Sequence, residues 1–202
     1  MRAFDRKFFT KKLVYTATFV AFGILFPMVF HSVQGAGPMI LPMHIPVLLC
    51  GMVCGWHFGI LCGVLSPLLS SAFTGMPPMS VPQLPAMICE LAVYGGVSGL
   101  LYHFVRTKKM IADIYVALLC AMLIGRCVNG ILYALIFNPA AYSFKIWVTA
   151  AFVTGFPGIV IQILLIPSLM VTLEKLKVIP QRYSPENLKP IENETPKLAE
   201  TV

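Results

Sequence analysis

Charge is scarce in this sequence. Asp, Glu, Lys and Arg together make up 11% of its residues, whereas hydrophobic residues make up 58%. Soluble domains carry roughly 25% charged residues, so the composition excludes an ordinary soluble protein. The sequence also lacks ten-residue segments of alternating hydrophobicity, which argues against a transmembrane β-barrel. Its long apolar runs therefore predict membrane-spanning helices, which satisfy their own backbone polar groups in lipid.

Catalytic and metal-binding patterns are missing as well. There is no Walker A glycine loop, no H-E-x-x-H motif, and no His or second Cys pair that would complete a metal site around the cysteines. Gly96-Val97-Ser98-Gly99 matches the G-x-S-G of rhomboid proteases, but that mechanism needs a His from a later span and the last His is His103. We therefore expect no enzyme, no metal site and no cofactor.

The basic residues gather in three places: before the first apolar run, between two later runs, and after the last run. These residues are Arg2, Arg6, Lys7, Lys11, Lys12, Arg106, Lys108, Lys109, Lys175, Lys177, Arg182, Lys189 and Lys197. This is the positive-inside pattern of membrane proteins rather than a basic groove for nucleic acid. It predicts a multi-pass protein of the cell membrane with both termini in the cytoplasm, and therefore an even number of spans.

The apolar runs divide into six predicted spans. They cover residues 13–30, 45 to a turn at 55–57, that turn to 73, 83–105, 114–137 and 144–173. We therefore predict an all-α membrane protein with six transmembrane helices. A cytoplasmic segment would cover residues 1–12, the membrane domain residues 13–178, and a disordered cytoplasmic tail residues 179–202.

Two ionisable residues lie inside these spans, Glu90 and Arg126. Each costs about 3 kcal/mol or more to place in the bilayer, so neither should face lipid. One hypothesis is a buried ion pair that fixes the register of two helices. The other is a solute site that opens outward, in which Arg126 holds an anionic or carbonyl group and Glu90 accepts hydrogen bonds or orients Arg126.

Further polar residues share a helix face with these two. Tyr94 follows Glu90 by four residues, and Asn129 and Tyr133 follow Arg126 by three and seven. Gln162 is another polar residue at membrane depth. Together they would line a small polar cavity, whereas singly each would serve as an interhelical hydrogen bond.

Small residues recur every four positions in several spans. The pattern permits close approach between helices and predicts packing inside the protein. Its members are Gly51, Gly55, Gly59, Gly63, Gly95 and Gly99. In the first span Ala17 and Ala21 have the same spacing, which suits either packing or docking of another membrane subunit.

Several segments resemble one protein family. Ala17-Thr18-Phe19-Val20-Ala21 matches the AxxxA pattern in helix one of the substrate-binding S components of energy-coupling factor (ECF) vitamin transporters. Residues 41–51, LPMHIPVLLCG, resemble the start of helix two in that family. Residues 66–71 and 74–78 resemble helix three with its following loop, and residues 90–95 and 98–100 resemble helix four. The resemblance extends from residue 13 to about residue 178.

The resemblance implies a six-helix subunit that binds one vitamin or vitamin precursor near the outer face of the membrane. Helix one, including Ala17 and Ala21, would dock on a transmembrane coupling subunit, and two cytoplasmic ATPase subunits would supply energy. The family's usual pocket implies a site built from the loop that ends at His44 and from helices four to six. In this chain the implied residues are His44, Glu90, Tyr94, Arg126, Asn129, Tyr133 and Gln162.

The resemblance defines the substrate less closely than it defines the fold and the partners. The Met-His-Ile-Pro-Val-Leu-Leu sequence is similar to that of members assigned to cobalamin precursors or to pantothenate. Arg126 would suit the carboxylate of pantothenate, and Met-rich outer loops would suit a flat benzimidazole such as α-ribazole. The alternative to an S component is a stand-alone secondary transporter driven by protons through Glu90. Such a transporter would carry an inverted repeat, and the sequence shows no convincing one.

Overall fold

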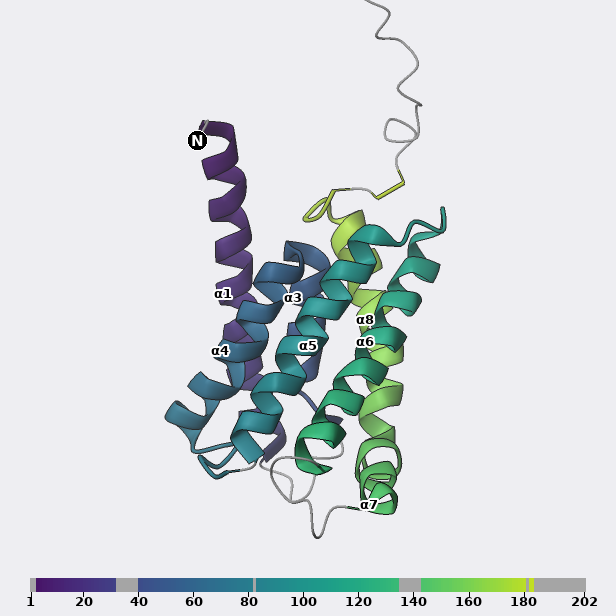
Figure 1. Cartoon of the computed structure of the whole chain (residues 1–202). Helices are drawn as coiled ribbons and strands as arrows, with labels where there is room; N and C mark the ends of the chain where they lie inside the picture. The colour runs from purple at the N-terminus through teal and green to yellow at the C-terminus, as the bar shows by residue number, and fades with distance from the viewer. Residues whose placement is uncertain (1–2, 32–39, 82, 135–142, 181, 184–202) are drawn as a thin grey trace, which may run out of the picture.

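The computed structural model describes residues 3–31, 40–81, 83–134, 143–180 and 182–183, and every regular element in these ranges is a helix (Figure 1). The helices are α1 (Ala3–His31), α3 (His44–Cys54), α4 (Trp56–Thr74), α5 (Gln83–Phe104), α6 (Met110–Leu132), α7 (Phe144–Val148), the π-helix η2 (Thr149–Thr154) and α8 (Phe156–Lys175).

Five helices in the described part are long and apolar enough to cross a membrane: α1 through its segment Phe9–Val29, then α4, α5, α6 and α8. This confirms the prediction of an all-α membrane protein. The expected second span is the 11-residue helix α3, which is about 17 Å long against a hydrocarbon core of about 30 Å. The expected sixth span is interrupted at Gly155, where η2 ends and α8 begins.

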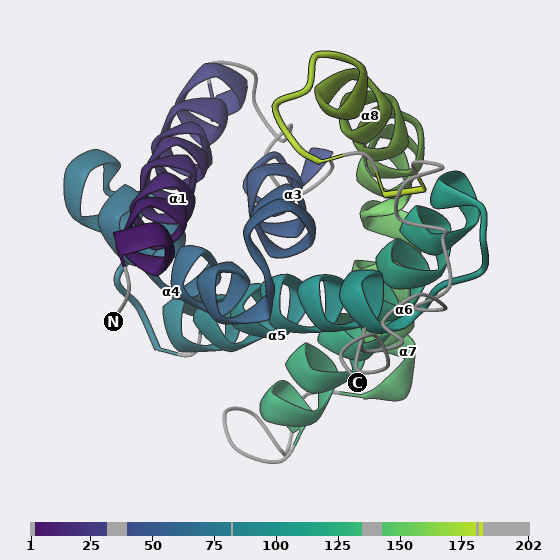
Figure 2. The same cartoon turned by 90° about the horizontal axis from the view of Figure 1, so that it is seen from above.

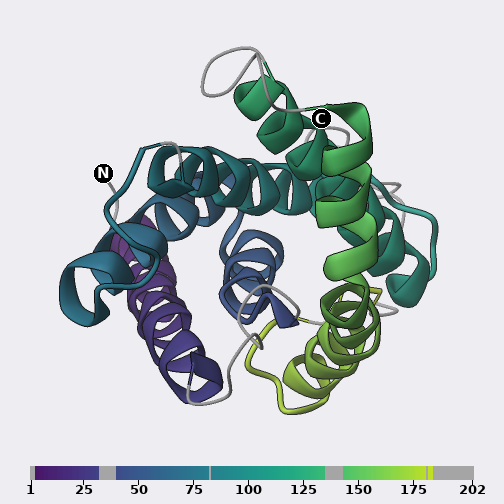
Figure 3. The same ribbon diagram turned by 90° about the horizontal axis from the view of Figure 1, so that it is seen from below.

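Helix α3 lies at the centre of the bundle. Seen along the bundle, α1, α4, α5, α6 and α8 form a horseshoe around it (Figures 2 and 3). Its residues carry no charge and are apolar on all sides, which is the pattern of a helix buried in a core. Val47, Leu48 and Cys50 have no exposed surface. The first residue of this central helix, His44, is therefore placed in the interior.

Glycines bring α5 against both α3 and α4. A Cβ added to Gly95 would lie 2.1 Å from the carbonyl oxygen of Gly59, and one added to Gly51 would lie 2.3 Å from that of Gly95. Only glycine permits backbones to approach this closely. The predicted packing role is confirmed at these positions. The close contact also holds the polar residues of α5 beside the start of α3.

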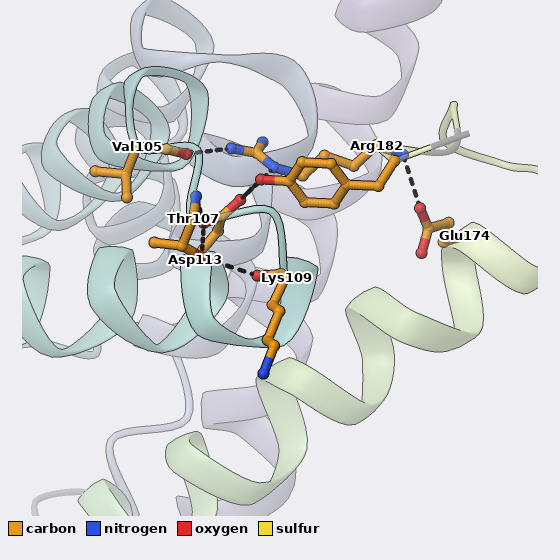
Figure 4. A network of polar contacts seen from close by, with 7 residues as sticks. Val105, Thr107, Lys109, Asp113, Glu174 and Arg182 are labelled. Atoms are coloured by element: carbon orange, nitrogen blue, oxygen red, sulfur yellow. Dashed lines mark hydrogen bonds and ion pairs between the residues drawn. The ribbon is translucent and has the colours of Figure 1, made fainter. Parts of the chain in front are cut away.

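Asp113 ties the connection between α5 and α6 to the C-terminal segment (Figure 4). Its side chain is fully buried. Oδ1 accepts hydrogen bonds from the backbone N–H and the hydroxyl of Thr107, at 2.8 and 2.6 Å. Oδ2 accepts one from Arg182 Nε at 2.7 Å and another from the hydroxyl of Tyr183. Every acceptor direction of this carboxylate is therefore used.

Arg182 is equally well partnered. Its Nη2 donates to the carbonyl of Val105 at 2.5 Å, and its guanidinium lies 4.1 Å from the ring centre of Tyr102. Burial alone would lower the pKa of Arg182, but its contacts with Tyr183 and Asp113 outweigh burial and raise that pKa above its ordinary value.

No sequence pattern predicts this Asp113 network, because its partners Arg182 and Tyr183 lie 69 and 70 residues away along the chain. Ile179 is also buried, so three residues of the expected disordered tail contact the helices. Residues 184–202 of that tail lie outside the described residues.

The glycine contact predicts a difference between two neighbouring substitutions. Gly95→Ala should lower the free energy of unfolding by about 3 kcal/mol, because its Cβ would force α4 and α5 apart. Gly96→Ala is the matched control, since its Cβ would meet only the flexible end of Ile60, at 3.0 and 3.3 Å. It should leave stability unchanged or raise it by up to about 1 kcal/mol. Thermal unfolding in detergent measures both, and equal stability of the two variants would contradict the packing account.

Candidate functional site

A cluster of polar side chains lies inside the bundle at the end where α3 begins. His44 comes from α3, Glu90 and Tyr94 from α5, and Arg126 and Asn129 from α6. His44, Tyr94 and Arg126 are buried, and the side chain of Glu90 is 14% exposed. Glu90 and Tyr94 are four residues apart, and Arg126 and Asn129 are three apart, so each pair lies on one face of its helix, as predicted.

Glu90 is the centre of the cluster. Asn129 Nδ2 donates a hydrogen bond to Oε2 at 2.6 Å, and His44 Nε2 lies 3.9 Å from Oε1. The rings of His44 and Tyr94 meet edge to face with centres 5.0 Å apart. Tyr94 and Tyr133 both lie within electrostatic reach of this carboxylate. Glu90 therefore joins the start of α3 to α5 and α6.

Arg126 makes one side-chain hydrogen bond within the described ranges, and Tyr94 lies within its electrostatic reach as well. One Nη1 hydrogen bond goes to the carbonyl of Ala151 in η2, and the guanidinium lies 5.8 Å from the ring centre of Phe152. The Nε and Nη2 atoms are buried and have no hydrogen-bond partner within the described ranges. Leaving a charged donor unsatisfied costs at least about 1–3 kcal/mol. Among the described residues, Arg182 and Asp113 form an ion pair and His44 lies 3.9 Å from Glu90, but no ion pair joins Glu90 to Arg126, so that hypothetical pair is not formed there.

Both charged residues line one cavity of about 260 Å³. The rest of its wall consists of Leu41, Asn129, Trp147, Ala150, Ala151 and Thr154. An acid, a guanidinium, an amide and a hydroxyl thus converge on one space. This set can hold a small molecule that has both acceptor and donor groups, with Arg126 supplying charge-assisted hydrogen bonds.

Sequence reasoning missed the wall contributed by α7 and η2. Trp147 lines the cavity and its indole N–H donates to the backbone carbonyl of Arg126 at 3.1 Å. Trp147, Ala151 and Thr154 recur at intervals of four and three, which is one face of a helix. The spacing of these three residues could have been recognised in the sequence. The π-helical geometry of Thr149–Thr154, which often occurs at functional sites, was not readable from it.

The remaining predicted residues lie elsewhere. Gln162 of α8 is buried, and both polar atoms of its amide have no hydrogen-bond partner in the described structure, but it is not among the residues of this cavity. Ala17 and Ala21 are exposed on α1, away from the cluster. No group of three or more His, Cys, Asp or Glu residues that could hold a metal ion occurs among the residues described.

Comparison with known proteins gives one match. A family model described as ECF transporter, substrate-specific component, matches residues 11–170. Neither the curated proteins nor the solved structures contain a match. The matched segment includes the whole polar cluster and the cavity.

The unsatisfied hydrogen-bond donors of Arg126 predict that replacing this residue has an unusual effect on the stability of the protein. Arg126→Met should leave the stability of the ligand-free protein unchanged or raise it by about 1–4 kcal/mol, because it removes an underpartnered buried charge. Arg182→Met is the matched control and should lower stability by about 3 kcal/mol, because it leaves the buried Asp113 carboxylate without its ion pair. Thermal unfolding after removal of bound small molecules compares the two. A large loss of stability in Arg126→Met would show that this arginine is a structural residue.

Proposed function

The chain belongs to the substrate-specific components of ECF transporters, and from this premise we propose that it is a high-affinity membrane receptor for one vitamin or vitamin precursor. The observation that carries the proposal is Arg126, a buried guanidinium with two nitrogen atoms that have no partner among the described residues, beside Glu90 in one cavity. An ionisable residue inside a membrane domain is by default a candidate for a functional site.

Each polar residue has a proposed role in the site. Arg126 binds a carboxylate, carbonyl or other acceptor of the ligand. Glu90 and Asn129, already joined at 2.6 Å, bind ligand hydroxyl or amide groups. His44, Tyr94 and Tyr133 set the position and charge environment of Glu90, and Gln162 adds a further polar contact from α8. The proposed ligand is a cobalamin precursor such as α-ribazole, or else pantothenate.

The proposed topology has six crossings with both termini in the cytoplasm. The basic loop between α5 and α6 lies at the same end of the bundle as the start of α1 and the end of α8 (Figure 1). Clusters of Lys and Arg at one end favour that end as the cytoplasmic side. The short α3 is counted together with α1, α4, α5, α6 and α8 to give six crossings. The cavity then lies toward the outer face.

The proposed partners are an ECF transmembrane coupling subunit and two ATPase subunits. Ala17 and Ala21 support helix α1 as the docking element, because both are exposed on it and lie one turn apart. Small residues at this spacing leave a shallow stripe along which a partner helix can approach closely. Large apolar residues on the same helix, Val14 and Leu25, are also exposed and supply contact area.

Retention of a small molecule by the lone chain tests the receptor function. The full chain purified from cells should retain a vitamin or vitamin precursor that mass spectrometry identifies in the extract. Arg126→Ala should retain at least about tenfold less, since losing a charge-assisted bond costs about 1.5–3 kcal/mol. Arg106→Ala, which changes an exposed arginine, should retain the parental amount. Equal retention by the two variants would contradict the role of the cavity.

The docking role of α1 predicts that substitutions on this helix affect uptake without affecting solute binding. Ala17→Trp or Ala21→Trp should abolish cellular uptake and leave solute binding by the purified chain intact, because the added ring blocks approach of the partner helix. Leu123→Trp on the exposed face of α6 is the control and should leave both unchanged. Loss of binding in the alanine variants, or parental uptake, would refute docking through this stripe.

A further inference from the structure

A second cavity of about 230 Å³ adjoins the polar one. Three methionines and four prolines form most of its wall: Met43, Met76, Met87, Pro27, Pro42, Pro77 and Pro78. Among the described residues, no Asp, Glu, Lys or Arg lines it, and Gln83 contributes an amide. We call it the methionine lobe, and the 260 Å³ cavity that contains Glu90 and Arg126 the polar lobe.

Two residues connect the lobes. Leu41 lines both of them. His44 lines the methionine lobe, while its Nε2 lies 3.9 Å from Oε1 of Glu90 in the polar lobe. Leu41 has a φ of 52°, in the left-handed region that leucine rarely adopts and that costs about 1–3 kcal/mol. The surrounding structure therefore holds this side chain in a fixed place between the two lobes.

The wall of the methionine lobe is built by specific contacts from α4. Buried Ser70 donates a hydrogen bond to the carbonyl of Met76 at 2.7 Å, and buried Ser71 donates to that of Pro77 at 2.6 Å. The hydroxyl of Thr74 donates to the carbonyl of Ser70 at 2.6 Å and accepts from the backbone N–H of Met76 at 3.2 Å. These bonds and the proline rings fix the connection that follows α4. The lobe is thus preorganised, which lowers the entropy cost of binding.

The chemistry of the lobe selects its occupant. Thioether sulfurs make favourable contacts with aromatic rings and adapt to flat shapes. The one polar side-chain atom that needs a partner is Nδ1 of His44, which is buried and has none within the described residues. A ring nitrogen or oxygen of the ligand would satisfy it. A largely apolar slot that offers one imidazole nitrogen and the Gln83 amide therefore fits a flat aromatic heterocycle.

We propose that the ligand has two parts: a flat aromatic heterocycle that occupies the methionine lobe, and a hydroxyl- or carbonyl-bearing part that occupies the polar lobe. This inference rests on the proposed receptor function and narrows its substrate class. Leu41 and His44 sit at the junction of the two parts and determine which ligands fit. A purely aliphatic carboxylic acid would fill the polar lobe alone.

The test uses the full chain purified from cells and the small molecule that it retains. Ultraviolet absorbance and mass spectrometry of the extract should identify an aromatic ring. Met76→Ala and Met87→Ala should each reduce the retained amount by about tenfold, the value of one good sulfur–aromatic contact with its buried area. Met79→Ala is the matched control in the same connection, 70% exposed and outside the lobe, and should retain the parental amount.

Several results would overturn the inference. The inference is overturned if the retained molecule has no aromatic ring. It is also overturned if the Met76, Met87 and Met79 variants retain equal amounts. If these results accompany loss of retention in Arg126→Ala, the receptor function stands and the methionine lobe alone is refuted. If the parent retains no molecule, saturable binding of added α-ribazole, which carries both parts, is the readout, and its absence contradicts the proposed two-part ligand. Met76 is 43% exposed, so its variant tests the lobe without disturbing the core.

Discussion

A charged group buried inside a protein must be paired or hydrogen-bonded, and this requirement shapes both ends of the bundle. The chain meets it in two contrasting ways. At the basic end, buried Asp113 and Arg182 satisfy each other and bind further groups from α5, α6 and the C-terminal segment. At the opposite end, Glu90 is paired with Asn129, but Arg126 donates to one backbone carbonyl and has two nitrogen atoms without a partner in the described part of the chain. The first arrangement stabilises the fold, and we propose that a ligand completes the second.

The fold brings the unsatisfied group and its neighbours together by close backbone packing. Glycines at the contacts of α3, α4 and α5 let the polar face of α5 approach the start of the central helix, so His44 reaches Glu90. The π-helical turn before α8 supplies the carbonyl of Ala151 and the opposite wall of the cavity. Serines at the end of α4 fix a second, methionine-lined wall next to it. The site thus depends on every part of the bundle that the family match covers.

Much of this could be predicted from the sequence, because spacing along one helix fixes which residues share its face. The pairs Glu90–Tyr94 and Arg126–Asn129 follow from that rule, and the long apolar runs predict the helices α4, α5 and α6. Spacing along one helix does not predict which helix faces pack against each other. Glu90 selects Asn129 and His44 rather than Arg126 because of how α3, α5 and α6 pack. The network of buried Asp113 was missed for the same reason, since it depends on contacts between distant segments.

The central claim is that the chain binds a solute and leaves transport to partners that hydrolyse ATP. The most direct measurement reconstitutes the chain alone in vesicles and follows the molecule recovered from it, with and without a proton gradient. The account predicts saturable binding that stops at one molecule per chain under both conditions. Accumulation of solute inside the vesicles beyond that amount, driven by the gradient, would show that the chain transports unaided and would contradict the account.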